Sequence, residues 1–251
     1  MVGDKISSAS DAKPADSFSN YGRTSGQRVA PLWHTALLIL YTLALLPQHF
    51  SLKGYRVFGI ELQTKVVIYG INVAMQAASV FFLAVGVHAC GRSLRGLIRS
   101  DKAQSRDLVD DVLAALAFCI VVIAVGFSLI VLLGSPRFAY QPSTTAPQTL
   151  LDLSMWVPLA ISSGIVEELI FRGYLMQQFY YYCGSMELAV CLQAILFSIG
   201  HGYNQTPAGF IHKFLLGVLF GVLAWRRRSL HAAMISHSVL DLLAGLTSVL
   251  R

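Results

Sequence analysis

The sequence predicts an all-α integral membrane protein with about seven transmembrane helices. Of its 251 residues, 55% are hydrophobic and only 13% are charged, which is about half the charged fraction of soluble domains. Long tracts carry no charge, and about 20 apolar residues in a helix suffice to cross the hydrocarbon core of a bilayer. A soluble helical bundle would need a polar face that repeats every 3.6 residues, and these tracts have none. Lipid is therefore the expected surroundings of most of the chain.

Four of the expected spans are clear, because they carry little or no charge: 32–50, 66–89, 112–133 and 230–250. Three weaker spans are shorter or contain charged residues, at about 153–177, 186–202 and 209–225. Residues 1–30 are rich in Ser, Asp and Lys without an apolar period, so we expect a disordered tail there. The predicted organisation is a tail (1–30), three N-terminal transmembrane helices (31–134), a Pro/Thr-rich loop (135–149) and a four-helix membrane domain (150–251).

The basic residues predict the orientation of these spans. With seven spans, the N-terminal tail, the loop at 91–107 and the arginine triplet at 226–228 lie on one side, and together they hold most of the 19 Lys and Arg residues. The positive-inside rule places that side, and with it the N-terminus, in the cytoplasm. The location would be a bacterial inner membrane or a eukaryotic endomembrane. Contact with anionic lipid is then sufficient to explain the net charge of +6. We expect no nucleic-acid partner.

Ionisable side chains crowd into the last four spans, whereas the first three have almost none. Such groups are costly within a membrane and usually face a cavity or one another, so they are functional candidates. Three spans present pairs four residues apart, which share a helix face. The helical rise places the candidates roughly 10–22 Å from the cytoplasmic span ends, compatible with one cluster. The residues concerned are Glu167, Glu168, Arg172, Phe197, His201, His237 and Asp241.

Some of these residues also have a purely structural interpretation. Arg172 and Glu168 could form a simple ion pair within one helix. An isolated histidine in or near a span more often bonds a backbone carbonyl or lies at the interface, which is our interpretation for His34, His49, His88, His212 and His231. A second buried carboxylate at Glu167 is not explained by one ion pair. His201 and His237 on other helices favour an assembled reaction centre.

Such a set of side chains suits hydrolysis by water. A buried carboxylate is a competent general base near neutral pH, and an imidazole beside it could share the proton. A second histidine, with a polar neighbour one helical turn on, could stabilise the oxyanion formed when water attacks a peptide carbonyl. No serine or cysteine lies in a nucleophile motif, which favours direct water attack over an acyl-enzyme. Two histidines and a carboxylate could instead bind catalytic zinc, although HExxH is absent.

Three segments resemble the ordered motifs EExxxR, FxxxH and HxxxN of the CAAX-protease and bacteriocin-processing family of intramembrane endopeptidases, which includes the abortive-infection-like proteins. They are EELIFR at 167–172, FSIGH at 197–201 and HSVLD at 237–241. The resemblance covers roughly residues 150–250 and implies that the last four helices form the catalytic core. Three motifs in the right order on separate spans are more specific than any one of them.

The resemblance implies a role for each matching position. Glu167 would activate water with His201 beside it, His237 and Asp241 would form the oxyanion pocket, and Glu168, Arg172 and Phe197 would support them. The family has been described both as metal-dependent and as metal-free. We expect no required cofactor; if a divalent metal such as zinc takes part, its ligands would be Glu167, His201, His237 and Asp241.

Position 241 departs from the family pattern, because Asp241 stands where the motif has Asn. An asparagine amide donates to an oxyanion, whereas an ionised aspartate repels one. Asp241 could still act if burial keeps it protonated, if it binds a metal, or if it orients His237. The substitution could also mark a weakened enzyme.

The functional prediction is an intramembrane endopeptidase that cleaves a membrane-associated or lipidated, CAAX-like protein or peptide. The alternatives are a non-enzymatic membrane protein of the same fold, in an immunity or partner-binding role, and a proton- or ion-coupled transporter. A transporter would more often show repeats or broken helices in both halves, whereas here the polar groups lie in one half.

Overall fold

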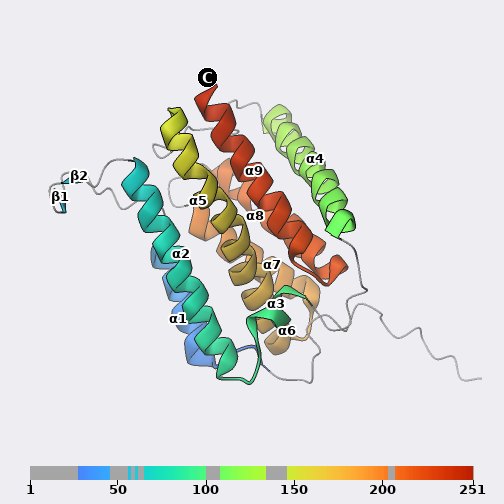
Figure 1. The fold of residues 1–251 in the computed structure, drawn as a ribbon. Coiled ribbons are helices and arrows are strands. Elements are labelled where there is room, and N and C mark those ends of the chain that lie inside the picture. The colour runs from blue at the N-terminus through green and yellow to red at the C-terminus, as the bar shows by residue number, and fades with distance from the viewer. Residues whose placement is uncertain are drawn as a thin grey trace, which may run out of the picture.

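The computed structural model is a bundle of helices (Figure 1). The structure describes residues 28–45, 56–57, 60–61, 65–99, 108–133, 146–202 and 207–250. The elements in these ranges are α1 (Leu32–Leu45), β1 (Arg56–Val57), β2 (Ile60–Glu61), α2 (Lys65–His88), α3 (Leu94–Ile98), α4 (Leu108–Leu133), α5 (Leu150–Glu168), the π-helix η2 (Leu169–Leu175), α6 (Met176–Cys183), α7 (Met186–Gly202), α8 (Pro207–Arg227) and α9 (His231–Val249).

The all-α membrane fold predicted from the sequence is confirmed. Five helical stretches in the described ranges are long and apolar enough to cross a membrane, and two shorter apolar helices, Leu32–Leu43 and Met186–His201, correspond to the first and fifth expected spans. Two small elements were not expected: the antiparallel pair of β1 with β2, and the short helix α3. Residues 1–27, 46–50 and 134–145 lie outside the described ranges, so the expected tail and most of the expected loop stay predictions.

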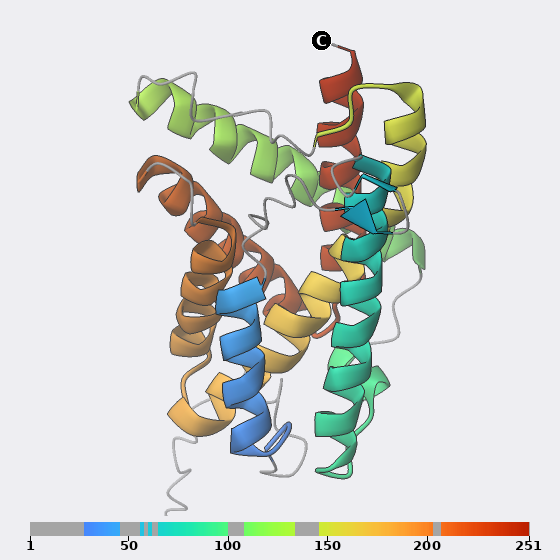
Figure 2. The same cartoon turned by 90° about the vertical axis from the view of Figure 1, so that its left-hand side faces the viewer.

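The fourth span is longer than expected, because α5, η2 and α6 form one continuous helical stretch of 34 residues. It begins at Thr149, whose side chain accepts from the backbone N–H of Asp152 while Asp152 bonds back in a capping box. It ends at Gly184, which adopts the left-handed conformation with φ of 69°, as helix ends commonly do. Figure 2 shows that its upper part stands beside α2 and its lower part runs obliquely across the bundle.

The local cause of this oblique path lies in the backbone. Pro158 lies inside α5, where it removes one helical hydrogen bond. Further on, η2 has wider π-helical turns and all seven of its residues are buried. Such π-helical insertions often occur at functional sites. Here the π-helix follows directly after Glu167 and Glu168 and contains Arg172, so the backbone irregularity and the charged residues coincide.

The outer faces of the helices are apolar, as lipid contact requires. Phe81 is 73% exposed, Ile120 69% and Leu132 77%, whereas a soluble monomer rarely exposes apolar patches of this extent. The polar residues are turned inward instead. Glu168, Arg172 and Gln193 are fully buried between helices.

Polar contacts define the two ends of the bundle. At one end Gln178 accepts from the backbone N–H groups of Val29 and Ala30, and Leu230 N–H donates to the carbonyl of Ile98. The same end holds the start of α4, where Asp111 pairs with Arg227 and contacts His231. At the opposite end Lys65 pairs with Asp152, and Ser248 donates to the carbonyl of Pro147. The described basic segments at 92–99 and 226–228 therefore share one end, as the sequence predicted.

Glycine allows the closest approach between helices around the polar interior. A Cβ atom placed on Gly164 of α5 would lie 2.6 Å from the backbone nitrogen of Ser238 in α9, and one on Gly217 of α8 would lie 2.8 Å from Cα of Ala194 in α7. Helices that touch backbone to backbone hold their side chains at fixed positions. The two contacts fix α5 against α9 and α7 against α8, which are the helices that carry the candidate site.

Candidate active site

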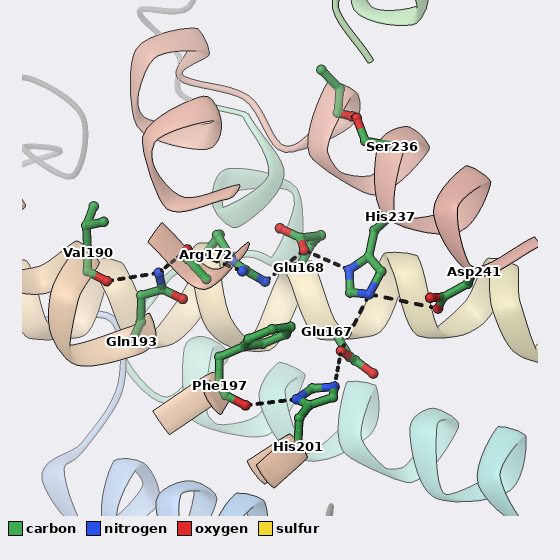
Figure 3. A network of polar contacts seen from close by, with 12 residues as sticks. Glu167, Glu168, Arg172, Val190, Gln193, Phe197, His201, Ser236, His237 and Asp241 are labelled. Carbon is green, nitrogen blue, oxygen red and sulfur yellow. Dashed lines mark hydrogen bonds and ion pairs between the residues drawn. The ribbon is translucent and has the colours of Figure 1, made fainter. Parts of the chain in front are cut away.

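Side chains from three helices converge at the end of α5 (Figure 3). Oε2 of Glu167 lies 3.3 Å from Nε2 of His201 on α7 and 3.7 Å from Nε2 of His237 on α9. Nε2 of His237 in turn lies 3.8 Å from Oδ2 of Asp241. The four residues that the sequence placed at the reaction centre are therefore neighbours in space. Their catalytic roles stay predictions.

The His201 ring is oriented by its own helix. Its Nδ1 lies 2.8 Å from the carbonyl oxygen of Phe197, one turn earlier. A carbonyl oxygen can only accept, so Nδ1 carries a proton and donates it. The opposite nitrogen, Nε2, is thereby turned towards Glu167. Phe197 thus acts on the site through its backbone oxygen, and its ring packs 4.2 Å from the imidazole, centroid to centroid.

The His237 ring is oriented in the same manner, by a side chain on another helix. Its Nδ1 lies 2.9 Å from Oε1 of Glu168, and that oxygen also accepts from Nη1 of Arg172 at 2.8 Å. A carboxylate paired with an arginine is an acceptor, so Nδ1 of His237 donates. Both imidazoles therefore use Nδ1 for orientation and direct Nε2 towards Glu167.

Glu167 is the group on which both rings converge. Its Oε2 is buried and, among the residues that the structure describes, has no hydrogen-bond partner. A neutral imidazole whose Nδ1 bears the proton presents a lone pair at Nε2, and a lone pair repels an ionised carboxylate oxygen. A proton or a water between the two atoms removes this conflict. The geometry thus provides proton acceptors around one small space.

Arg172 and Glu168 support the His237 ring, because Glu168 pairs with Arg172 and contacts His237. Both side chains are fully buried, and Nη2 of Arg172 also donates to the carbonyl of Gly217 at 3.4 Å. The guanidinium lies over the Phe197 ring, 4.6 Å from its centroid, and 5.1 Å from that of Phe220, distances at which a cation is attracted to an aromatic face. The predicted supporting residues are thus all in contact with the network, and none is a simple surface ion pair.

Two participants were not singled out from the sequence. Gln193 on α7 is fully buried and donates to the carbonyl oxygens of Gly217 and Val190, so it shares the Gly217 carbonyl with Arg172. Trp156 donates its indole N–H to the carbonyl of Asp241 at 2.9 Å. The sequence could have indicated Gln193, because it is an amide side chain inside an apolar span. It could not have indicated Trp156, because that contact depends on how α5 packs against α9.

Two of the remaining histidines, His34 and His231, have structural partners, whereas His88 is exposed at the end of α2. His34 is buried and contacts the Phe82 carbonyl and the Tyr174 hydroxyl at 2.9 and 2.8 Å. His231 contacts Asp111 at the end of the bundle. Nε2 of His212 would lie 3.7 Å from a Cβ on Gly126, which places it towards α4. His49 lies outside the described residues.

The candidate ligands do not form a ready metal site in this geometry. Two imidazole nitrogens and two carboxylates have the donor chemistry of a zinc site. Within the part of the chain that the structure describes, however, no three His, Cys, Asp or Glu side chains are grouped closely enough to hold a metal ion.

Buried carboxylates and histidines that meet on three membrane helices are compatible with an intramembrane protease-type site. A comparison with protein families supports this class: residues 148–243 match the family model described as type II CAAX prenyl endopeptidase Rce1-like. That segment of the chain is therefore similar to the Rce1-like CAAX prenyl endopeptidases, which agrees with the family that the three sequence motifs resemble. The match covers α5 to α9 up to residue 243 and includes every candidate site residue. No curated protein and no solved structure matches the chain.

Proposed function

We propose that this protein is an endopeptidase that hydrolyses a peptide bond of a membrane-associated, lipidated substrate, with Glu167 as the general base. The observation that supports it is the common direction of His201 and His237: each ring uses Nδ1 for orientation, by Phe197 and by Glu168, and turns Nε2 towards Oε2 of Glu167. A purely structural ion pair needs no such pair of pre-oriented rings. Pre-orientation of proton-transfer groups is what general base catalysis requires.

In the proposed reaction Glu167 removes a proton from a water molecule whose oxygen attacks the peptide carbonyl carbon. His201 shares that proton, because its Nε2 lies 3.3 Å from the carboxylate. The carbonyl oxygen becomes the oxyanion of a tetrahedral intermediate. When the C–N bond breaks, the proton passes to the departing nitrogen, which leaves one new carboxylic acid and one new amine.

The oxyanion is proposed to form next to Nε2 of His237. To donate to it, His237 must carry protons on both ring nitrogens, and in that form it forms ion pairs with Glu168 at 2.9 Å and Asp241 at 3.8 Å. Preorganised donors of this kind typically contribute a factor of about 10²–10³ in kcat. Asp241 holds His237 from one turn further along α9, and its side chain is 35% exposed, so it lies on the open side of the site.

The substrate is proposed to enter from within the membrane. The site lies on helices whose outer faces are apolar, and a lipid chain on the substrate adds about 0.8 kcal/mol of membrane affinity per buried CH₂. A lipidated tail would therefore be held in the bilayer next to the bundle. The matching family is that of a prenyl endopeptidase, which makes a prenylated C-terminal peptide the first substrate to test.

The decisive experiment measures turnover of quenched fluorescent peptides, with and without a prenyl group, by the detergent-purified protein and its Glu167→Gln variant. Each protein is assayed with and without a metal chelator. We expect turnover by the wild type, a loss of at least about 10² with Glu167→Gln, and no effect of the chelator. The matched control is Glu187→Gln, because Glu187 lies in the exposed first turn of α7.

Loss of turnover on chelation, restored by zinc, would replace the metal-free mechanism by a metal-dependent one. Turnover that survives Glu167→Gln would remove Glu167 from the role of base. Absence of turnover from prenylated and unprenylated peptides alike would favour a non-enzymatic protein of the same fold.

A further inference from the structure

The charge balance of the site leaves a carboxylate without a partner. Glu168 is neutralised by Arg172 at 2.8 Å. Glu167 and Asp241 remain, and both contact Nε2 of His237. In the proposed reaction Glu167 takes up the proton of the water and the negative charge moves to the oxyanion, so an imidazolium at His237 faces the oxyanion and Asp241 together. Like charges in a medium of low dielectric constant repel each other strongly, so a second cation would stabilise the oxyanion.

Lys213 of α8 lies on the correct face of its helix to supply that cation. Residues four and seven positions apart share one helix face, and Lys213 stands four before Gly217 and seven before Phe220. The Gly217 carbonyl accepts from Arg172, and the Phe220 ring lies 5.3 Å from the His237 ring, centroid to centroid. The face that bears Lys213 is therefore the face turned towards the candidate site.

The level of Lys213 along the bundle fits as well. Helices α8 and α9 follow one another through a short turn, so they run in opposite directions. From the level of Phe220 and His237, Lys213 lies about 10 Å towards the far end of the bundle and Asp241 about 6 Å towards the same end. A lysine side chain spans such a difference, since its stem has four methylene groups.

The surroundings of the ammonium group support this placement. The ammonium forms no ion pair within 4 Å with a described residue, but it is near enough for its charge to act electrostatically on the carboxylates of Glu167 and Asp241. The Lys213 side chain is half-buried in a helix long enough to span the membrane, where an ammonium without a counter-charge is costly. Among the described residues, no hydrogen bond or ion pair holds it elsewhere.

We propose that Lys213 is a positioning residue that supplies the counter-charge to Asp241, so that the pocket beside His237 accepts an oxyanion instead of repelling it. The inference rests on the proposed endopeptidase function. It explains how an aspartate is tolerated at position 241, and it makes Lys213 and Asp241 a functional pair across α8 and α9.

The test is a double-mutant cycle of wild type, Lys213→Met, Asp241→Asn and the double variant, assayed for kcat and KM on the cleaved peptide. We expect Lys213→Met to lower kcat about tenfold in the wild-type background and less than twofold relative to Asp241→Asn alone. Lys213→Arg should restore most of the activity, because it keeps the charge. Lys65→Met is the control lysine, since Lys65 pairs with Asp152 at the far end and its effect should not depend on residue 241.

Equal effects of Lys213→Met in both backgrounds would overturn the proposal. It would also be overturned if Lys213→Met raised KM only for peptides with a free C-terminal carboxylate and not for amidated ones, because Lys213 would then bind the substrate's terminus.

A second readout separates failure of this inference from failure of the proposed function. Thermal unfolding of the same four proteins in detergent requires no activity. We expect Lys213→Met to lower Tm in the wild type and to have a smaller effect when Asp241→Asn is already present. Such coupling without any turnover would refute the endopeptidase and retain the charge pair, whereas purely additive Tm changes would refute the pair.

Discussion

At the residue scale, two adjacent glutamates have opposite surroundings. The side chain of Glu168 is fully buried, and its Oε1 accepts from Arg172 and from His237. Glu167 is turned towards the two Nε2 atoms, and its Oε2 has no hydrogen-bond partner among the described residues. Neighbouring positions on a helix point about 100° apart. This difference directs the Glu168 carboxylate towards Arg172 and the Glu167 carboxylate towards the two Nε2 atoms. Substitutions at the two positions should therefore act on different properties.

Glu168→Gln should mainly destabilise the protein. The change leaves the Arg172 guanidinium buried without its counter-charge, and breaking a buried ion pair from one side costs about 3–5 kcal/mol. Thermal or denaturant unfolding in detergent measures this. Glu167→Gln is the matched comparison, and its unfolding midpoint should stay near that of the wild type. Equal destabilisation by both changes would contradict the division of roles.

At the element scale, the close contact between α5 and α9 sets the distance between Glu167 and His237. We expect Gly164→Ala to lower both stability and turnover, because the added Cβ would meet the backbone of Ser238, and overpacking costs about 1–3 kcal/mol. Gly70→Ala on α2 is the control, since a Cβ there has nothing within 4 Å. That change should be neutral or slightly stabilising. Turnover and Tm of the two variants provide the comparison.

The π-helix η2 is also held from outside the matched domain. The Tyr174 hydroxyl lies 2.8 Å from Nδ1 of His34 and 3.0 Å from Oγ1 of Thr35, both on α1. The Phe82 carbonyl accepts from Nε2 of His34, so Nδ1 of a neutral His34 accepts the tyrosine proton. Through this chain α1 and α2 bind the π-helix that carries Arg172.

Tyr174→Phe should therefore weaken the connection between the two halves of the chain. It leaves the buried Nδ1 of His34 without a donor, at a cost of about 1–3 kcal/mol, and we expect turnover to fall with it as Arg172 loses its fixed position. Tyr181→Phe, at an exposed position of α6, is the control. Unchanged Tm and turnover in Tyr174→Phe would show that α1 does not position the site.

At the scale of the whole molecule, the described basic segments lie at one end of the bundle and the end of α9 lies at the other. We expect both the N-terminus and the turn after α8 to face the cytoplasm, because basic loops are retained on that side. Impermeant thiol reagents on a cysteine-free background with single cysteines at the exposed Arg226 and at Ser248 measure this in intact cells. Labelling of position 248 and protection of position 226 is the expected result. The reverse pattern would invert the orientation.

The sequence by itself determined the all-α membrane fold and the set of candidate residues. Charge-free tracts of more than 20 residues can only be stable in lipid, and ionisable groups inside such tracts are too costly to be incidental. The four-residue spacings also predicted correctly that Glu168 lies beside Arg172 and that Phe197 lies beside His201, because both contacts lie within about one helical turn.

Only the tertiary structure decided which atoms meet across helices. Three contacts join helices whose relative rotation and depth the sequence does not encode locally. They are the bond from His237 to Glu168, the convergence of both Nε2 atoms on Glu167, and the sharing of the Gly217 carbonyl by Arg172 and Gln193. Those two quantities are set by the close contacts at Gly164 and Gly217 and by the irregular path of α5 and η2. The length and the polar face of a membrane helix can be inferred from its local composition. Its angle to a neighbouring helix depends on how the two helix surfaces pack.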